Sequence, residues 1–410
     1  MKIDQSKLEK QKHFIKIWKE NGRYGTLEAA TGFGKTYVGI LIIKAMLKKY
    51  PNATTAIIVP SNYLRNKWND EIKYHNLKNI KVNTVHQWVD DPGRYDLRIY
   101  EEIHGYTGGE IFSTVFDRVI GRWTLGLTAK ERNKDDDKKV IEEHCPIIYR
   151  IPLQECLDND WVAPFTVYNL GLDIIGEERK KYDKMHSSFI KYFSTFDFNL
   201  GQMYKALKND RFCQHLADQL QWEPKMIKIH AAQANRIMQK RKKYLYTADI
   251  LFDTTVNIIN NFSDKRIITF SEVTSFADKL AEAIPNSVAY HSSLKTIMVN
   301  GKKKGQIVRA REALEAFESK KVDVIHTARA LNEGVDIHDI DMSVKTSFNS
   351  TIIDSIQRTG RTIRKDENNE NKHAIEVNLF IRKTQSERWL SKSQRETPNV
   401  KYKESIDEIV

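Results

Sequence analysis

Residues 30–36 read ATGFGKT and lie between a short β-rich stretch and a helical pattern. Glycines in such a loop let backbone N–H groups surround a phosphate, and the helix N-terminus that follows adds partial positive charge. Lys35 would reach the β- and γ-phosphates, and the Thr36 hydroxyl would bind Mg²⁺. Ala29 stands where the common eight-residue pattern has its first glycine. The stretch therefore predicts a site for a nucleotide and Mg²⁺ made by Thr31, Gly32, Gly34, Lys35 and Thr36. A glycine-rich turn between a strand and a helix is the alternative.

A second stretch carries groups that ATP hydrolysis needs besides a phosphate cradle. Residues 98–106 read RIYEEIHGY, a strand that ends in two carboxylates and a histidine. Hydrolysis requires one carboxylate near the metal and another that orients or deprotonates water. Glu101 and Glu102 fit these roles, with Glu101 as a metal ligand and His104 behind them. A solvated strand end is the alternative for this stretch taken alone.

The cations that would neutralise the developing charge lie far downstream. Arg358, Arg361 and Arg364 recur every three residues within residues 355–365, SIQRTGRTIRK, and so share one helix face. Three stacked arginines repel one another unless an anion lies among them. The alternative is an ordinary surface helix, but such a helix usually alternates arginine with glutamate, and the next glutamate is Glu367.

The elements that must position these groups follow an alternating pattern. Helical stretches such as residues 35–50 separate apolar, β-rich runs at residues 24–30, 54–61, 95–102 and 122–129. The pattern returns at residues 265–272, 287–293, 322–328, 341–347 and 374–382. Near-continuous apolar strands separated by helices indicate parallel sheets. We therefore expect an α/β fold with two parallel-sheet halves and a helical segment between them.

Composition narrows the class of protein. The chain has 410 residues and no apolar run of about 18 residues, so no membrane span is expected. Its three cysteines are widely spaced, which fits a reducing cytosol without disulfides or a zinc site. The formal charge is +12, and residues 176–250 hold 15 Lys and Arg against 8 Asp and Glu. Nucleic acid is therefore the first partner to consider.

Seven motifs, in this order, resemble the superfamily 2 helicases and translocases of the DExH/DEAH-like branch. They are Gln11 with Ile15 and Trp18, then ATGFGKT, VPSNYLRNKW, EEIH, LGLTAKER, TARALNEGVDI and QRTGRTIR. The motifs cover most of the chain outside residues 170–260. The resemblance implies two RecA-like domains that close on ATP, with arginines of the second domain completing the site. The compact size also resembles phage-encoded branched-DNA helicases.

The resemblance assigns roles to matching positions. These are Gln11 for the adenine edge, Gly334 and Asp336 for nucleotide contact from the second domain, Gln357, Arg361 and Arg364 for the catalytic interface, and Thr128 and Lys130 for coupling hydrolysis to movement. Two positions depart from the family. Glu101 replaces its aspartate, which moves the carboxylate by about 1.5 Å, and Lys130 replaces the second hydroxyl of its Thr-Ala-Thr motif.

A strand backbone is expected to cross the tops of both RecA-like domains, held by hydroxyl, backbone and basic groups. The matching residues are Ser61, Arg65 and Thr84 in the first domain and His291, Ser292, Thr327 and Arg329 in the second. In the middle segment, most aromatics are expected to form the segment's own core. The basic run Lys240, Arg241, Lys242 and Lys243 is expected to contact nucleic acid, in an accessory element that helps to separate strands.

The sequence thus predicts a first RecA-like domain at residues 1–168, a helical basic and aromatic accessory segment at residues 169–255, and a second RecA-like domain at residues 256–410. We expect a monomeric, cytoplasmic ATP-dependent helicase or translocase, in the host cytoplasm if phage-encoded. Forked or branched DNA is the expected substrate, with 3′ to 5′ polarity. The alternatives are an RNA helicase and a nucleotide-gated nucleic-acid clamp with weak hydrolysis, which Glu101 and Lys130 would favour.

Overall fold

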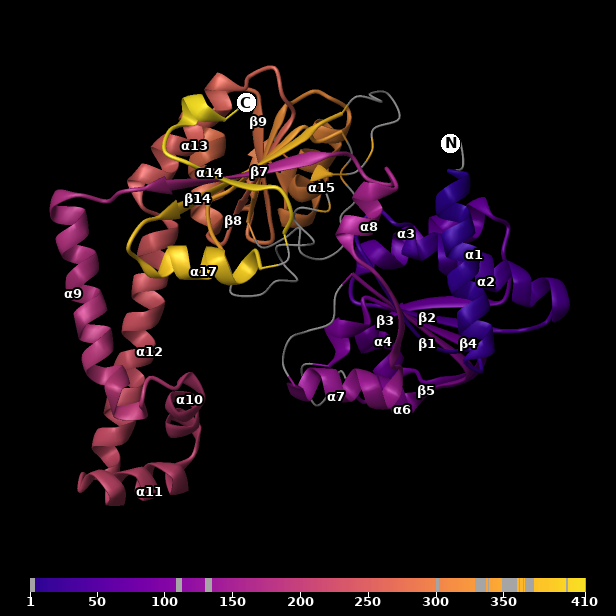
Figure 1. Cartoon of the computed structure of the whole chain (residues 1–410), viewed down its shortest axis with the longest axis horizontal. Helices are drawn as coiled ribbons and strands as arrows, with labels where there is room; N and C mark the ends of the chain where they lie inside the picture. The colour runs from indigo at the N-terminus through magenta and orange to yellow at the C-terminus, as the bar shows by residue number, and fades with distance from the viewer. Residues whose placement is uncertain are drawn as a thin grey trace.

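Two parallel sheets organise the chain (Figure 1). The computed structural model describes residues 4–107, 113–129, 135–299, 302–328, 337, 339–348, 360, 362–363, 365, 372–395 and 397–409. Within these residues, no helix is long and apolar enough to cross a membrane. Cys145, Cys156 and Cys213 are free and buried.

The first sheet lies in the N-terminal part of the chain, and all its pairings are parallel. In spatial order its strands are β3 (Ile80–Thr84), β2 (Thr55–Val59), β4 (Gly93–Glu101), β5 (Val119–Thr128), β1 (Tyr24–Ala29) and β6 (Ile147–Ile151). Its helices are α1 (Gln5–Glu20), α2 (Lys35–Lys49), α3 (Asn62–Tyr74), α4 (Val85–Asp90), α6 (Val115–Arg118), α7 (Asp135–His144) and α8 (Leu153–Asp158), with the 3-10 turn η1 (Ile103–Tyr106). Strand β2 is buried along its whole length, which explains its unbroken apolar sequence.

The second sheet is also parallel throughout its described pairings. In spatial order its strands are β15 (Val400–Lys403), β7 (Phe165–Leu172), β14 (Ala374–Ile381), β13 (Met342–Lys345), β8 (Ile267–Ser271), β12 (Val324–Ala328) and β9 (Ser287–His291). Around it lie α13 (Asp249–Asn261), α14 (Thr274–Ala283), α15 (Gln306–Glu318), α17 (Gln385–Ser393) and η4 (Ile406–Glu408). A short antiparallel hairpin, β10 (Ile297–Val299) and β11 (Lys302–Lys304), is attached to this half.

The structure moves both predicted domain boundaries. The boundary at residue 168 falls inside β7, which pairs with β14 over its full length, so the first sheet's half ends before Phe165. The boundary at residue 255 falls inside α13, whose Leu251, Ile258 and Ile259 belong to the second sheet's core. A strand that leaves one half to pair in the other has no local sequence signal, because pairing depends on distant residues.

The segment between the sheets forms a helical arm made of α9 (Gly176–Phe193), η2 (Ser194–Phe196), α10 (Leu200–Lys208), α11 (Asp210–Leu220) and α12 (Pro224–Tyr246). Helices α9 and α12 pack side by side and project from the second sheet, with α10 and α11 at the far end (Figure 1). The arm has its own core, which includes Phe193, Phe196 and Cys213. The arm's own core takes fewer of its aromatics than the sequence predicts, because Tyr182 and Tyr244 pack in the second sheet's core and Phe198, Tyr204 and Trp222 are exposed.

The two sheet halves share contacts near the carboxyl edge of the first sheet. The Ala163 N–H donates to the Ile363 carbonyl at 2.8 Å, and Ile363 packs in the same core cluster as Phe33. Tyr63 packs against the first half's core and also against the second half's cluster around Phe270. These contacts bring the phosphate-loop sequence next to the arginine-rich sequence.

Candidate ATP site and nucleic-acid path

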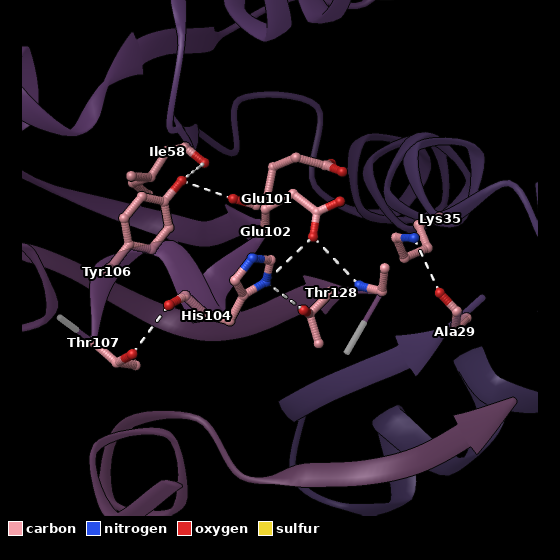
Figure 2. A network of polar contacts seen from close by, with 10 residues as sticks. Ala29, Lys35, Ile58, Glu101, Glu102, His104, Tyr106, Thr107 and Thr128 are labelled. Carbon is pink, nitrogen blue, oxygen red and sulfur yellow. Dashed lines mark hydrogen bonds and ion pairs between the residues drawn. The ribbon is translucent and has the colours of Figure 1, made fainter. Parts of the chain in front are cut away.

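The loop between β1 and α2 has the backbone of a phosphate cradle. Gly32 and Gly34 have φ of 94° and 88°, values that glycine adopts readily. A Cβ on Gly32 would lie 2.8 Å from Val162 Cγ1, so the packing also requires glycine there. Gly34 caps the first turn of α2, where free N–H groups point outward. Lys35 Nζ donates to the Ala29 carbonyl at 3.0 Å, at the position where an incoming phosphate would compete for it (Figure 2).

Two side chains of α1 hold the same loop. Gln11 is buried and its Nε2 donates to the Phe33 carbonyl at 2.9 Å. Lys7 Nζ donates to the Gly32 carbonyl at 2.5 Å, and burial lowers the pKa of Lys7. Gln11 therefore lies at the phosphate loop, with its amide nitrogen bound to the loop backbone. Lys7 was not predicted; the one signal for it is its spacing of four residues from Gln11 on one helix face.

Glu101 is the last residue of β4, and its carboxylate is buried. Its side chain is 4% exposed and its Oε2 accepts a hydrogen bond from Trp68 Nε1 at 3.2 Å. Burial, and then the negative charge of Glu102, raise the pKa of Glu101 to about 7. Glu101 and Glu102 place two carboxylates close together, and hard oxygen donors suit Mg²⁺. The donor chemistry therefore fits Mg²⁺, with Glu101 and the Thr36 hydroxyl as the groups that would hold it.

Glu102 begins a hydrogen-bonded chain that runs into β5 (Figure 2). Its backbone is left-handed, with φ of 50°, a costly conformation for a residue with a Cβ. Its Oε2 accepts from the Ala129 N–H at 3.3 Å and lies 3.4 Å from His104 Nδ1. His104 Nδ1 lies 2.8 Å from Thr128 Oγ1. The predicted water-orienting, linking and coupling residues are thus in direct contact.

Strand order explains why β5 carries this link. Strand β5 lies between β1, which leads into the phosphate loop, and β4, which ends in Glu101. Strands β1 and β4 are therefore separated by β5 and are not hydrogen-bonded to each other. The carboxyl ends of all three strands meet at one edge because the sheet is parallel. Thr128, at the end of β5, therefore lies between the strand that leads into the phosphate loop and the strand that ends in Glu101.

The arginine-rich sequence, residues 355–365, contacts the carboxyl edge of the first sheet through residues that the structure describes. A Cβ on Gly360 would lie 2.3 Å from the Cβ of Thr31, so the backbone of this segment touches the phosphate loop. Lys365 Nζ forms an ion pair with Asp160 at 2.8 Å. The predicted residues Lys130, Arg329, Gly334, Asp336, Gln357, Arg361 and Arg364 lie outside the described residues.

The first half's two predicted strand-binding stretches meet at the ends of β2 and β3. Arg65 donates from a guanidinium nitrogen to Gln87 Oε1 at 3.0 Å, which joins residues 60–65 to residues 83–88. Ser61 caps α3 by accepting from the Leu64 N–H, and Thr84 caps α4 together with Gln87. The hydroxyls of Ser61 and Thr84 thus serve helix capping, and the Arg65 guanidinium is bonded to Gln87.

In the second half the structure separates accessible residues from buried ones. Ser292 is exposed beyond the end of β9. His291 is 1% exposed and its Nε2 lies 2.9 Å from Asp278 Oδ1. Thr327 is buried inside β12, where its hydroxyl donates to the Thr269 carbonyl at 2.7 Å. Direct contact of the His291 and Thr327 side chains with a strand, as the sequence predicts, therefore does not fit this conformation.

Comparisons with known proteins agree with this geometry. Residues 4–87 match the family described as type III restriction enzyme, res subunit, and residues 250–366 match the helicase conserved C-terminal domain. The chain is 23% identical over 408 residues to the DNA 3′-5′ translocase XPB2 of Sulfurisphaera tokodaii, covering 94% of this chain and 84% of that protein. The chain belongs to the superfamily 2 helicases and translocases. Membership implies an ATPase that depends on nucleic acid.

Solved structures show the same fold for this helicase. One is the ATP-dependent type ISP restriction-modification enzyme LlaBIII bound to DNA, with a TM-score of 0.61 and 15% identity. That match covers 98% of this chain but only 31% of LlaBIII. The helicase domain of Hef from Pyrococcus furiosus gives a TM-score of 0.52 at 14% identity, covering 93% of this chain and 98% of that one.

The basic run of the helicase's arm is only partly exposed. Lys240 and Lys243 are exposed on α12 and Lys242 is half-buried. Arg241 is 4% exposed, and its guanidinium donates to His186 Nδ1 at 2.6 Å. The prediction that Arg241 contacts a strand directly therefore does not fit, because a helix turns neighbouring residues to different faces.

Proposed function

We propose that this helicase is an ATP-dependent DNA translocase that moves 3′ to 5′ as a monomer and remodels forked or branched DNA. The observation that carries the proposal is the contact chain from Glu102 through His104 to Thr128. It links the hydrolytic carboxylate to the motif assigned to coupling. The choice of DNA and of polarity is supported by the relative named as a DNA 3′-5′ translocase.

The ATP chemistry follows from the positions of the side chains. Lys35 would exchange the Ala29 carbonyl for phosphate oxygens. Bound Mg²⁺ would supply positive charge near the transferred phosphoryl group. One oxygen of Glu102 is held by the Ala129 N–H, which leaves Oε1 to accept a hydrogen bond from the attacking water. Arg361 and Arg364 are proposed to stabilise the transition state from the second domain, since Gly360 touches Thr31.

The arm is proposed to act where strands separate. Its far end exposes apolar side chains that its own core does not cover: Phe198, Leu200, Tyr204, Leu220, Trp222 and Met226. Phe198 is 57% exposed and has φ of 56°, a strained conformation for a bulky residue. Exposed aromatics can stack on unpaired bases. Branched DNA as the preferred substrate rests on this feature.

The test is ATP hydrolysis and unwinding on single-stranded DNA, duplex, fork, four-way junction and RNA. We expect stimulation by DNA above RNA and unwinding of forks from a 3′ tail. The Lys35→Ala and Glu102→Gln variants should lose turnover. Greater stimulation by RNA would favour an RNA helicase. DNA binding without turnover above these variants would favour the nucleotide-gated clamp.

A further inference from the structure

A cavity lies where the arm joins the second sheet, away from the ATP site. Its volume is about 610 Å³. Tyr182 and His186 of α9 form one wall, and the β14–α17 turn with the exposed face of α17 forms the other. The cavity thus lies between the base of the arm and helix α17 of the second half.

The cavity wall carries an excess of positive charge. Lys383, Arg388, Lys392 and Arg395 line it, against one carboxylate, Glu387. That carboxylate accepts a hydrogen bond from the Lys383 N–H at 2.9 Å. Among the residues that the structure describes, none of the four cations forms an ion pair with a carboxylate. Four cations converging on one space repel one another unless an anion lies among them.

A fifth cation stands behind this wall. Arg241 is buried against the Phe189 ring, 4.3 Å from its centroid. Its Nε has no hydrogen-bond partner, and no ion pair to a carboxylate is found for it in the described part of the chain. Burial and the nearby charge of Arg388 lower the pKa of Arg241. An uncompensated buried guanidinium is costly, so a negative charge in the adjacent cavity would stabilise it.

Arg241 also fixes the hydrogen-bonding role of His186. A guanidinium only donates, so His186 Nδ1 must accept the 2.6 Å bond. The neutral ring then carries its proton on Nε2, which can donate. Tyr182 stacks on His186, and its hydroxyl oxygen accepts from the Gln385 N–H at 3.1 Å, so its own proton is free to donate. The cavity wall thus offers O–H, N–H and cationic donors together, the set that an oxyanion accepts.

We propose that this cavity binds a phosphodiester group of the DNA strand that this helicase engages. The inference rests on the proposed function. A strand is favoured over a free anion because α12, which packs against α9, carries further cations near the cavity wall. Lys242 lies 5.9 Å from the Trp389 ring of α17, and Lys240 and Lys243 are exposed on the same helix. A phosphate held there would tie the arm to the second domain whenever DNA is bound.

The experiment measures affinity of the full-length protein for a forked DNA over a series of salt concentrations. The test variant is Arg388→Gln with Lys392→Gln, two exposed residues of α17. The matched control is Lys48→Gln with Lys49→Gln, which removes the same charge from the exposed end of α2. Each lost phosphate contact lowers the slope of log affinity against log salt by about 0.7 to 0.9. We expect the slope to fall by about one to two in the test variant and to stay near wild type in the control.

Inorganic phosphate at matched ionic strength forms the second arm, with thermal unfolding as the readout. One result would be that phosphate stabilises the wild type but not the test variant, while the salt dependence of DNA affinity has the same slope in both proteins. The site would then take a free anion, and the proposal is overturned. Equal slopes for test and control variants overturn it as well. Both results differ from failure of the proposed function, in which the wild type itself shows no DNA binding or DNA-stimulated ATPase.

Discussion

At the carboxyl edge of the first sheet, Lys35 and Glu102 are already bonded to protein groups, whereas at the base of the arm four cations line a cavity without an ionic partner among the described residues. The first region holds charges of both signs close together, because Lys35 and Glu102 both act electrostatically on Glu101. The second has four cations and a single carboxylate, Glu387, around one cavity.

The difference fits two kinds of ligand. A nucleotide with its metal brings charge of both signs and must leave after each cycle, so weak internal bonds that exchange with it are useful. A strand brings only negative charge, and its phosphates repeat, so a standing cationic surface suits it. The predictions that follow test whether the two regions differ in this way.

The largest expected effect is on turnover through Arg361. Replacing Arg361 with Ala should lower the ATPase rate by about 10³- to 10⁵-fold, because an arginine finger acts on charge that develops in the transition state. ATP affinity should change little, since Lys35 and the loop remain. The control is Lys365→Ala, which removes an exposed cation of the same segment that pairs with Asp160. Near-normal turnover would remove Arg361 from the catalytic set.

The next effect concerns the buried charge of Glu101. Its pKa of about 7 means that the folded protein holds this proton more tightly than the unfolded chain does. Between pH 4.5 and 7 the folded state binds more protons, so the free energy of unfolding falls as pH rises. In magnesium-free buffer, Glu101→Gln should remove a penalty of about 3 kcal/mol at pH 8 and little at pH 5. Thermal unfolding at both pH values checks this, and an equal shift at the two values would contradict it.

A smaller effect is expected when the side chain at position 101 is shortened by one methylene group. Glu101→Asp restores the carboxylate usual in this family but withdraws it by about 1.5 Å and loses the bond from Trp68 Nε1. We expect turnover to fall by roughly tenfold to a hundredfold, because misplacement by about 1 Å can have that cost. Titration with Mg²⁺ should show weaker activation. Faster turnover would mean that Glu101 impairs this motor rather than fitting it.

The sequence predicts well that the two acidic and phosphate-loop motifs follow strands of one parallel sheet, because its signals there are local. ATGFGKT and EEIH each combine residue types with a strand end, and a parallel sheet then brings those ends together. Thr128, which the resemblance assigns to coupling, lies against His104 at the same edge. The intervening position of β5 was not predicted, since strand order depends on contacts far apart in the chain.

Burial at the nucleic-acid path was much harder to predict. His291 and Thr327 lie in motifs that match the family, yet both side chains are buried and bonded to Asp278 and to the Thr269 carbonyl of the second half. Arg241 belongs to a basic run but faces inward, and its partner His186 is 55 residues away in sequence. The cavity at the arm's base needs α9 and α17 together, and no periodicity connects these helices before they pack.

The smallest expected effect concerns the far end of the arm, where exposed aromatic rings, and not cations, are proposed to contact DNA. Phe198→Ala with Trp222→Ala should lower fork unwinding relative to single-strand-stimulated ATPase. Base stacking on an aromatic ring contributes about 1–3 kcal/mol per base. Phe198 and Trp222 are 57% and 43% exposed, so part of each ring is covered by protein and the stacking energy is smaller. We therefore expect fork unwinding to fall by about threefold to tenfold. The matched control is Tyr74→Ala, an aromatic side chain 83% exposed on α3. If both variants unwind forks equally well, the arm's rings do not act on separated bases, and its contribution would reduce to the charged contacts at its base.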